Sequence, residues 1–281
     1  MKTLENIVHK LIINGNLLYQ PGLFHGKIGV AVFFFHYARH TGNKLFEDYA
    51  MNLIKNVITQ INSNKIPTRY DIGVAGIGCG FEYILQKGFL EAENNEIFKE
   101  FDKWMCRAAM YEMFPNLNLP DGLTGCGRYF IFRLNGNGNS NDELHKALKH
   151  IIWKIINRIE KDKIFENEQP DVYRFFYDLT SLPMYAKIYS GTLQQCKNWE
   201  CICKPDAQKM FHYMGSLQRL YVCQKYFNLN LSDEIEQEWK KWNETDHVFP
   251  MDIGFLNGSV SECLLYLTYY SQHDISWLNL L

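Results

Sequence analysis

Two kinds of helical pattern alternate along the chain. In the first kind, apolar residues recur every three or four positions and leave a polar face, in residues 45–61, 98–109 and 144–159. This spacing predicts helices with one side in water, the last opened by a capping box of Ser140 and Glu143. The second kind is apolar nearly all round, in residues 30–35, 81–85, 129–132 and 263–267. Helices of the second kind are buried between other helices.

A glycine-rich turn precedes each of the apolar segments. The turns occupy residues 22–29, 73–80, 122–127 and 254–258, and two degenerate copies lie at 178–181 and 213–216. Their spacing of about 35 to 55 residues fits one helical hairpin per unit. Strands are disfavoured because the intervening stretches are long and have the helical period. We therefore predict an all-α fold, an α/α toroid of about five to six repeats, with residues 1–281 in a single domain.

The glycines of these turns have a mechanical explanation. Glycine accepts positive φ and allows two backbones to approach closely, which a crowded ring of helices requires. The same turns would also direct helix N-termini, with their free N–H groups, towards the centre of the ring. A ligand at the centre could use those groups, although turn geometry alone accounts for the glycines.

Composition and charge narrow the class of protein. The chain has 281 residues, of which 47% are hydrophobic and 21% charged, and its net charge is −2. This composition excludes a disordered chain. The scattered basic residues predict no nucleic-acid partner. The longest apolar run is too short to cross a bilayer, and residues 1–18 lack the pattern of a signal peptide, so we expect a cytoplasmic protein without membrane contact.

The turns at residues 22–29, 73–78 and 254–258 resemble the inner-helix turns of the lanthionine synthetase C-like (LanC-like) family. The resemblance is strongest over residues 20–135 and 250–281 and weak over 160–245. It implies an α/α toroid. For active members it also implies zinc-assisted addition of a cysteine thiol to a dehydrated serine or threonine of a precursor peptide.

The resemblance further implies zinc ligands from a Cys-Gly turn and a later Cys-His-Gly turn, and the second of these is missing. The nearest match is Phe24-His25-Gly26 in the first repeat, and the closing turn reads Leu256-Asn257-Gly258. No cofactor is therefore predicted. Zinc stays possible only through weak candidate ligands, Cys79, Cys126 and His212, although small buried thiols are the favoured interpretation of both cysteines. Cys196, Cys201 and Cys203 lack the spacing of common zinc folds and are interpreted as incidental loop cysteines.

Six further residues are candidates for a site. His25 could be a general acid or base, or a turn histidine bonded to a carbonyl. The carboxylates that precede glycine turns could cap helices or act on a carbohydrate, and they are Asp71, Asp121 and Asp252. Arg128 could anchor a peptide carboxylate or pair with an aspartate. Asn257 is a candidate ligand-binding residue in the closing turn.

Three functions fit these features. The leading hypothesis is a LanC-like protein of peptide modification without the usual zinc, a pseudoenzyme that binds a peptide or a modifying-enzyme partner. The first alternative is a carbohydrate-active α/α-toroid enzyme that uses the aspartates, and it rests on fold analogy alone. The second alternative is a scaffold whose concave face docks another protein.

Overall fold

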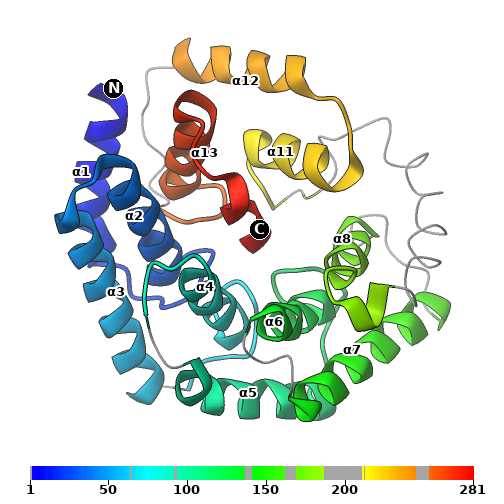
Figure 1. Cartoon of the computed structure of the whole chain (residues 1–281). Coiled ribbons are helices and arrows are strands. Elements are labelled where there is room, and N and C mark those ends of the chain that lie inside the picture. The colour runs from blue at the N-terminus through cyan, green and yellow to red at the C-terminus, as the bar shows by residue number, and fades with distance from the viewer. Residues whose placement is uncertain are drawn as a thin grey trace. The chain divides into compact units, whose positions relative to one another are not determined.

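All the regular structure described in the computed structural model is helical, as the sequence predicts (Figure 1). The structure describes residues 2–63, 65–91, 94–136, 141–161, 169–186, 211, 213–244 and 253–281, and none of these forms a strand. Their contacts group into unit 1, residues 1–65 and 212–281, and unit 2, residues 66–211. A single domain over residues 1–281 stays a prediction. None of the helices described is long and apolar enough to span a membrane.

Unit 2 is built from two layers of helices. One layer is the row of α4 (Val74–Gln86), α6 (Leu123–Asn135) and α8 (Gln169–Leu179), in which each helix packs on the next. The other layer contains α5 (Asn94–Tyr111) and α7 (Asp142–Lys161), which pack on each other and on α6 (Figure 1). The apolar helices α4 and α6 thus share one layer with α8, and the helices with a polar face, α5 and α7, cover it.

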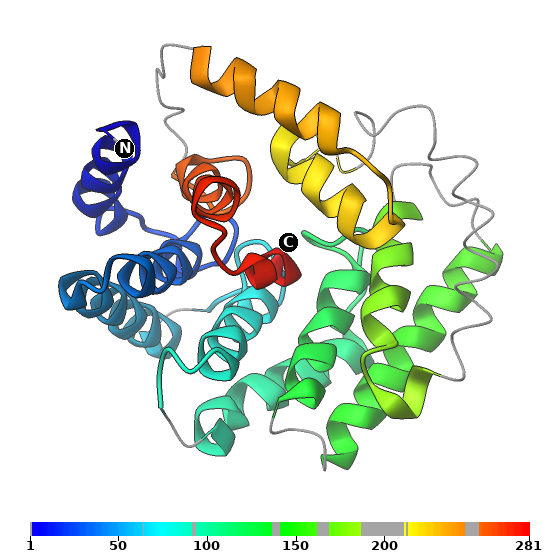
Figure 2. The same ribbon diagram turned by 45° about the horizontal axis from the view of Figure 1, so that its top comes forward.

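Unit 1 combines the two ends of the chain, blue and yellow to red in Figure 2. Its buried row contains α11 (Ser216–Phe227), α13 (Ser259–Ser271) and α2 (Lys27–Thr41), in that order of contact. Three further helices pack on this row, α1 (Lys2–Gly15), α3 (Lys44–Ser63) and α12 (Ser232–Glu244). The chain ends in the 3₁₀ helix η2 (Ile275–Leu280), which buries Trp277.

The two predicted kinds of helix are confirmed. Residues 27–38 of α2 and residues 74–84 of α4 are all buried, so these helices have no polar face. By contrast, α3 and α7 bury apolar residues on one side and expose lysines and acids on the other. Ser140 of the predicted capping box lies outside the described residues. The side chain of Asn141 accepts hydrogen bonds from the N–H groups of Glu143 and Leu144, at 3.0 and 3.3 Å, and therefore caps this helix.

Each glycine turn closes a backbone loop of constant length at the start of a buried helix. The N–H of the first helical residue donates to the carbonyl seven positions earlier: Lys27 to Gln20 at 3.0 Å, Val74 to Pro67 at 2.8 Å and Leu123 to Asn116 at 3.1 Å. In α13 the second residue, Val260, donates in the same way to Ile253 at 3.3 Å. One N–H group in the first turn of each of these helices is thus bonded within the protein, so that group is not free for a ligand as the sequence suggested.

Close approach explains why glycine ends each loop. A Cβ at Gly73 would overlap the carbonyl oxygen of Pro67, and one at Gly26 would overlap that of Gln20. Both glycines have extended backbone, with φ of −119° and −144°, so a positive φ is not the reason. The loop can close only where no side chain separates the N-cap residue from that carbonyl.

The first and last glycine turns pack directly on each other within unit 1. The N–H of Leu256 donates to the carbonyl of Phe24 at 3.2 Å, and the ring of Phe255 fills the space beside Gly29. Near the other end of α2, His36 Nδ1 lies 2.9 Å from Nε2 of His273. The ends of the chain are therefore joined by backbone and side-chain contacts.

A buried polar network joins α4, α5 and α6 of unit 2. The guanidinium of Arg133 donates to Glu82 at 2.7 Å and to both carboxylate oxygens of Asp102 at 3.0 and 2.9 Å. The hydroxyl of Tyr129 donates to Asp102 at 2.6 Å, and Phe98 stacks 4.0 Å from the guanidinium. Burial raises the pKa of Glu82, whereas Arg133 lowers it. The positive charge of Arg133 compensates the carboxylates of Glu82 and Asp102, which would otherwise destabilise the packing of these three helices.

Replacement of the N-cap glycine of α4 tests the loop geometry. We expect Gly73→Ala to lower the free energy of unfolding by about 2 to 3 kcal/mol, because the methyl group overlaps a backbone carbonyl that cannot move freely. Chemical denaturation measures the change. Gly88 has φ of +61° and open space around its Cα, so Gly88→Asn is the control and should stay within about 0.5 kcal/mol of wild type. Equal effects of the two substitutions would contradict the close-approach explanation.

Loss of the buried cation tests the network. Arg133→Met should lower the free energy of unfolding by about 3 to 5 kcal/mol, because Glu82 and Asp102 would lose their counter-charge. Lys103 is exposed and lies 3.8 Å from Glu100, so Lys103→Met should change stability by less than about 0.5 kcal/mol. Urea titrations of both variants measure the difference, and a stable Arg133→Met variant would refute the assigned role.

Candidate functional site

Asp71 is tied into the turn before α4. It is buried, and its Oδ1 accepts hydrogen bonds from Arg69 Nε at 3.0 Å and from the N–H of Ile72 at 2.8 Å. The second guanidinium contact goes to Oδ2, and Asp71 raises the pKa of Arg69. The carboxylate therefore stabilises the turn, and its catalytic role stays a prediction.

Asp121 occupies the corresponding position before α6. Its Oδ1 accepts a hydrogen bond from Asn116 Nδ2 at 3.1 Å, and its N–H donates to Asn118 Oδ1 at 3.2 Å. Asp121 also acts electrostatically on Arg69, so unit 2 brings both aspartates near one cation. The N-caps of α4 and α6 are Gly73 and Gly122, without a side-chain bond. The cap interpretation is therefore wrong for Asp71 and Asp121, and Asp252 lies outside the described residues.

Arg128 is paired within unit 2. Its guanidinium lies 3.0 Å from Oδ2 of Asp178 and 6.0 Å from the ring centre of Tyr70, and its side chain is buried. The interpretation as an aspartate partner is confirmed. A role as the anchor of a peptide carboxylate stays a prediction, because it would require exchange of Asp178 for the ligand.

Cys79 and Cys126 follow the glycines of neighbouring turns in unit 2. Both are free thiols and fully buried, which confirms that they pack as small apolar side chains. Burial raises the pKa of each thiol far above its ordinary value, and for Cys79 the charge of Arg128 only partly opposes this. Both are therefore held as neutral thiols.

In unit 1, Gln218 joins two glycine turns. Its Oε1 accepts hydrogen bonds from the N–H of Asn257 at 2.9 Å and of Gly215 at 3.4 Å, and its Nε2 donates to the carbonyl of Phe255 at 2.9 Å. Asn257 has φ of +55°, a conformation that asparagine tolerates better than most residues, and is exposed. His25 is also exposed, in the first turn. A buried amide thus fixes the turn that presents Asn257.

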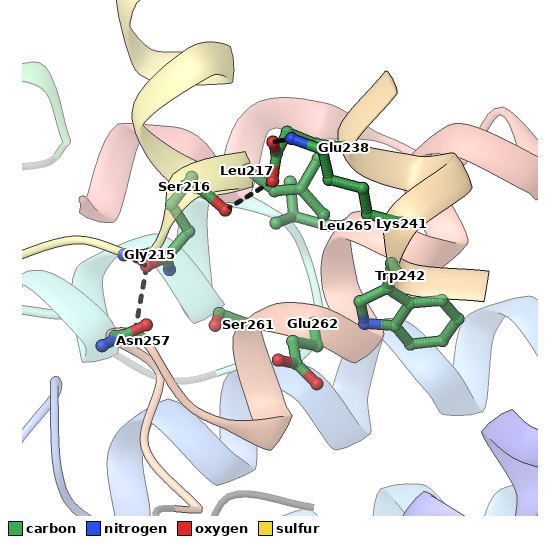
Figure 3. Close-up of a pocket in the computed structure, with 11 residues that line it drawn as sticks. Gly215, Ser216, Leu217, Glu238, Lys241, Trp242, Asn257, Ser261, Glu262 and Leu265 are labelled. Atoms are coloured by element: carbon green, nitrogen blue, oxygen red, sulfur yellow. Dashed lines mark hydrogen bonds and ion pairs between the residues drawn. The ribbon is translucent and has the colours of Figure 1, made fainter. Parts of the chain in front are cut away.

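Next to these turns lies a pocket of about 250 Å³ (Figure 3). The residues that line it all belong to unit 1: Gly215, Ser216, Leu217, Gln218, Glu238, Lys241, Trp242, Asn257, Ser261, Glu262 and Leu265. Among them, only Asn257 is a residue that the sequence analysis selected for a site. The volume is below the usual range of drug-sized sites and suits a single side chain or a small metabolite.

The two carboxyl groups of this pocket, Glu262 and Glu238, have pKa values shifted in opposite directions. Burial raises the pKa of Glu262, and the indole of Trp242, which lies beside it in Figure 3, lowers it in part. Glu238 differs, because Lys241 lies 2.5 Å from its Oε1, Ser216 donates to its Oε2 at 3.1 Å, and its pKa is lowered. One acid of the pocket is thus matched by a cation, and the other is held in an unfavourable environment.

Sequence reasoning missed Gln218, Trp242 and Glu262. The only local signal was an acid in the first turn of α13, a helix that is otherwise almost entirely apolar. Trp242 comes from α12, and Gln218 comes from α11. Three consecutive helices meet at the pocket, and the periodic pattern of each one alone does not reveal which of its polar residues face the others.

A family model described as lanthionine synthetase C-like protein matches residues 18–181, more than half of the chain. The chain belongs to this family. Among solved structures, nisin cyclase is similar to this LanC-like chain, with 14% sequence identity and a TM-score of 0.62 over 99% of this chain and 84% of nisin cyclase. That likeness shows the fold and confirms the predicted α/α-toroid class. No curated protein matches the chain.

The zinc that the LanC-like family implies does not fit the described residues. Zinc needs thiolate, imidazole or carboxylate ligands grouped around one point. In the part of the chain that the structure describes, no three such side chains are grouped to hold a metal. Cys79 and Cys126 are neutral thiols, and Phe24, where the motif has cysteine, is fully buried. His212, Cys196, Cys201 and Cys203 lie outside the described residues.

The raised pKa of Glu262 predicts a stabilising substitution. In the folded chain the pKa of Glu262 lies above its value in the unfolded chain. The free energy of unfolding therefore falls as the pH rises from the unfolded-state pKa to the folded-state pKa. Glu262→Gln removes that loss, so at pH 7 the variant should have a higher Tm than wild type, and the gain should vanish below about pH 4. Thermal unfolding across this pH range measures it.

Glu236 serves as the matched control for this substitution. It is exposed on α12, and Lys240 lowers its pKa, so Glu236→Gln should give no gain in Tm at pH 7. If Glu262→Gln were as stable as wild type or less stable at pH 7, the unfavourable environment of Glu262 would be refuted.

Proposed function

We propose that this LanC-like chain serves in peptide modification by binding a peptide or a modifying-enzyme partner, without zinc-assisted ring closure of its own. The observation that carries the proposal is the state of the candidate ligands. Cys79 and Cys126 are held protonated by burial, and no metal-binding group of three is formed by the residues that the structure describes. Membership of the family supports the link to peptide modification.

The chemistry of ring closure explains why the ligands matter. The sulfur of a cysteine adds to the β-carbon of a dehydrated residue, the S–H proton leaves, and the α-carbon gains a proton. A thiolate attacks far better than a thiol, and zinc supplies it by lowering the thiol pKa. In this chain the thiols nearest the glycine turns have pKa values raised by burial. This environment favours binding over activation.

The carbohydrate-active alternative needs a pair of carboxylates that can reach a substrate. Asp71 is instead bound by Arg69 and by a backbone N–H, and Asp121 is bonded to Asn116. The described geometry therefore favours the peptide-binding proposal. The cytoplasmic location expected from the sequence belongs to the same proposal.

Metal content and thiol consumption test the proposed function together. The full chain, purified without chelators, should contain well below one zinc per chain by elemental mass spectrometry. A peptide with one cysteine and one dehydrated serine should bind, as measured by fluorescence anisotropy, with the same affinity before and after EDTA treatment. Its free thiol, titrated by alkylation, should remain.

Nisin cyclase, a similar fold whose name denotes ring formation on nisin, is the positive control for thiol consumption. Stoichiometric zinc together with loss of the peptide thiol would refute the non-catalytic proposal. Absence of peptide binding, with no zinc and no reaction, would refute the peptide-binding part.

A further inference from the structure

The pocket of unit 1 contains a carboxyl group, that of Glu262, which the proposed function does not use. Its carboxylates come from two elements, Glu238 on α12 and Glu262 on α13. Glu238 already has a cation, because Lys241 lies one helical turn later on the same helix and contacts it at 2.5 Å. Arg219 on α11 acts on Glu238 as well. The charge of Glu238 is thus compensated within the protein.

Glu262 has no such compensation from the described residues. The influences on its carboxyl group are burial, which disfavours the charged form, and the Trp242 indole, which favours it. A half-buried carboxylate that lacks a cation lowers stability unless a ligand provides the opposite charge. Proteins keep such groups mainly at binding and catalytic sites.

The surroundings of Glu262 indicate the shape and polarity of a ligand as well as its charge. Leu217 and Leu265 line the same pocket and offer apolar surface to an alkyl chain. Trp242 is held by aromatic contacts to Trp239 at 5.4 Å and to Tyr266 at 5.8 Å between ring centroids, so its position is fixed. An indole beside a carboxylate is a favourable environment for an ammonium group, since its π face attracts cations. Figure 3 shows Glu262 and Trp242 side by side at one end of the pocket.

We propose that this pocket binds a primary ammonium group on a short alkyl chain, with Glu262 as its counter-charge, Trp242 as its aromatic wall and Leu217 and Leu265 beside its methylene groups. Within the proposed function, on which this step rests, the ammonium belongs to the bound peptide, as a lysine side chain or as the N-terminus. The turn that contains Asn257 borders the pocket and can contact the adjoining peptide backbone.

Competing ligand classes fit less well. An anion would meet two carboxylates, and the only lysine in the pocket is already paired with Glu238. A neutral sugar could stack on Trp242 but would leave the Glu262 charge uncompensated. An ammonium group provides the compensation, and a volume of about 250 Å³ accommodates a single side chain.

Isothermal titration calorimetry of the full chain with three small probes tests the proposal. The probes are Nα-acetyl-lysine methylamide, the norleucine analogue that lacks the ammonium, and glycylglycinamide, which carries only an N-terminal ammonium. The lysine probe or glycylglycinamide should bind at least about tenfold more tightly than the norleucine probe, because a charge-assisted contact is lost in the latter. The order of the two amines shows whether a side chain or an N-terminus is recognised.

Variants assign the site within the chain. Glu262→Gln should weaken binding of the better amine by about tenfold or more, and Trp242→Leu should weaken it severalfold. Glu236→Gln, outside the pocket on α12, should bind as wild type does. Because Glu262→Gln is expected to raise the Tm, a loss of affinity in that variant is not a loss of folding.

Equal affinity for the norleucine probe, or unchanged affinity in Glu262→Gln, would overturn the ammonium site. That outcome leaves the zinc and thiol measurements of the proposed function unaffected. Conversely, a zinc-loaded, ring-forming chain that still binds the amine through Glu262 would refute the non-catalytic proposal and keep the ammonium site. The two proposals can therefore fail separately.

Discussion

The fold depends on a backbone hydrogen bond that spans seven residues and closes a glycine-ended loop at the start of a buried helix. The bond recurs before α2, α4 and α6, and one residue further along in α13. It satisfies an N–H group that a helix otherwise leaves to water, in a place where water is excluded. Only glycine at the N-cap allows the carbonyl to come close enough. An apolar helix can therefore begin in the interior, and this makes the two-layer packing within each unit possible.

Much of this architecture is readable from the sequence. Glycine turns followed by apolar runs predict buried helices, and the segment at 30–35 is entirely buried in α2. The polar face of residues 45–61 likewise predicts the covering role of α3. Both predictions succeed because the burial of a helix determines the spacing of apolar residues in that helix's own sequence. The error at α4 is also local: the carbonyl of Pro67, rather than the side chain of Asp71, receives the first N–H of this helix. Side-chain and backbone acceptors compete at helix starts, and the sequence does not show which one is closer.

The candidate site was much less predictable. Asn257 was selected because of its place in the closing turn, but Gln218, which fixes that turn, is 39 residues away in the chain. Glu262 looks like an acid of an ordinary first helical turn until Trp242 of another helix is placed beside it. Conversely, Asp71 and Arg128 have the residue types expected of a site, and the fold provides each with a close counter-ion. Long-range pairing decides which polar residues are available, and one sequence does not contain that information.

The amide exchange rates of Lys27, Val74 and Leu123 test the loop bond most directly. First-turn amides of a helix have no partner within it and ordinarily exchange rapidly. If the seven-residue bonds form as described, these three amides should exchange as slowly as amides in the middle of the same helices, in hydrogen–deuterium exchange resolved by NMR. Rapid exchange of these three amides alongside protected helix interiors would contradict the account.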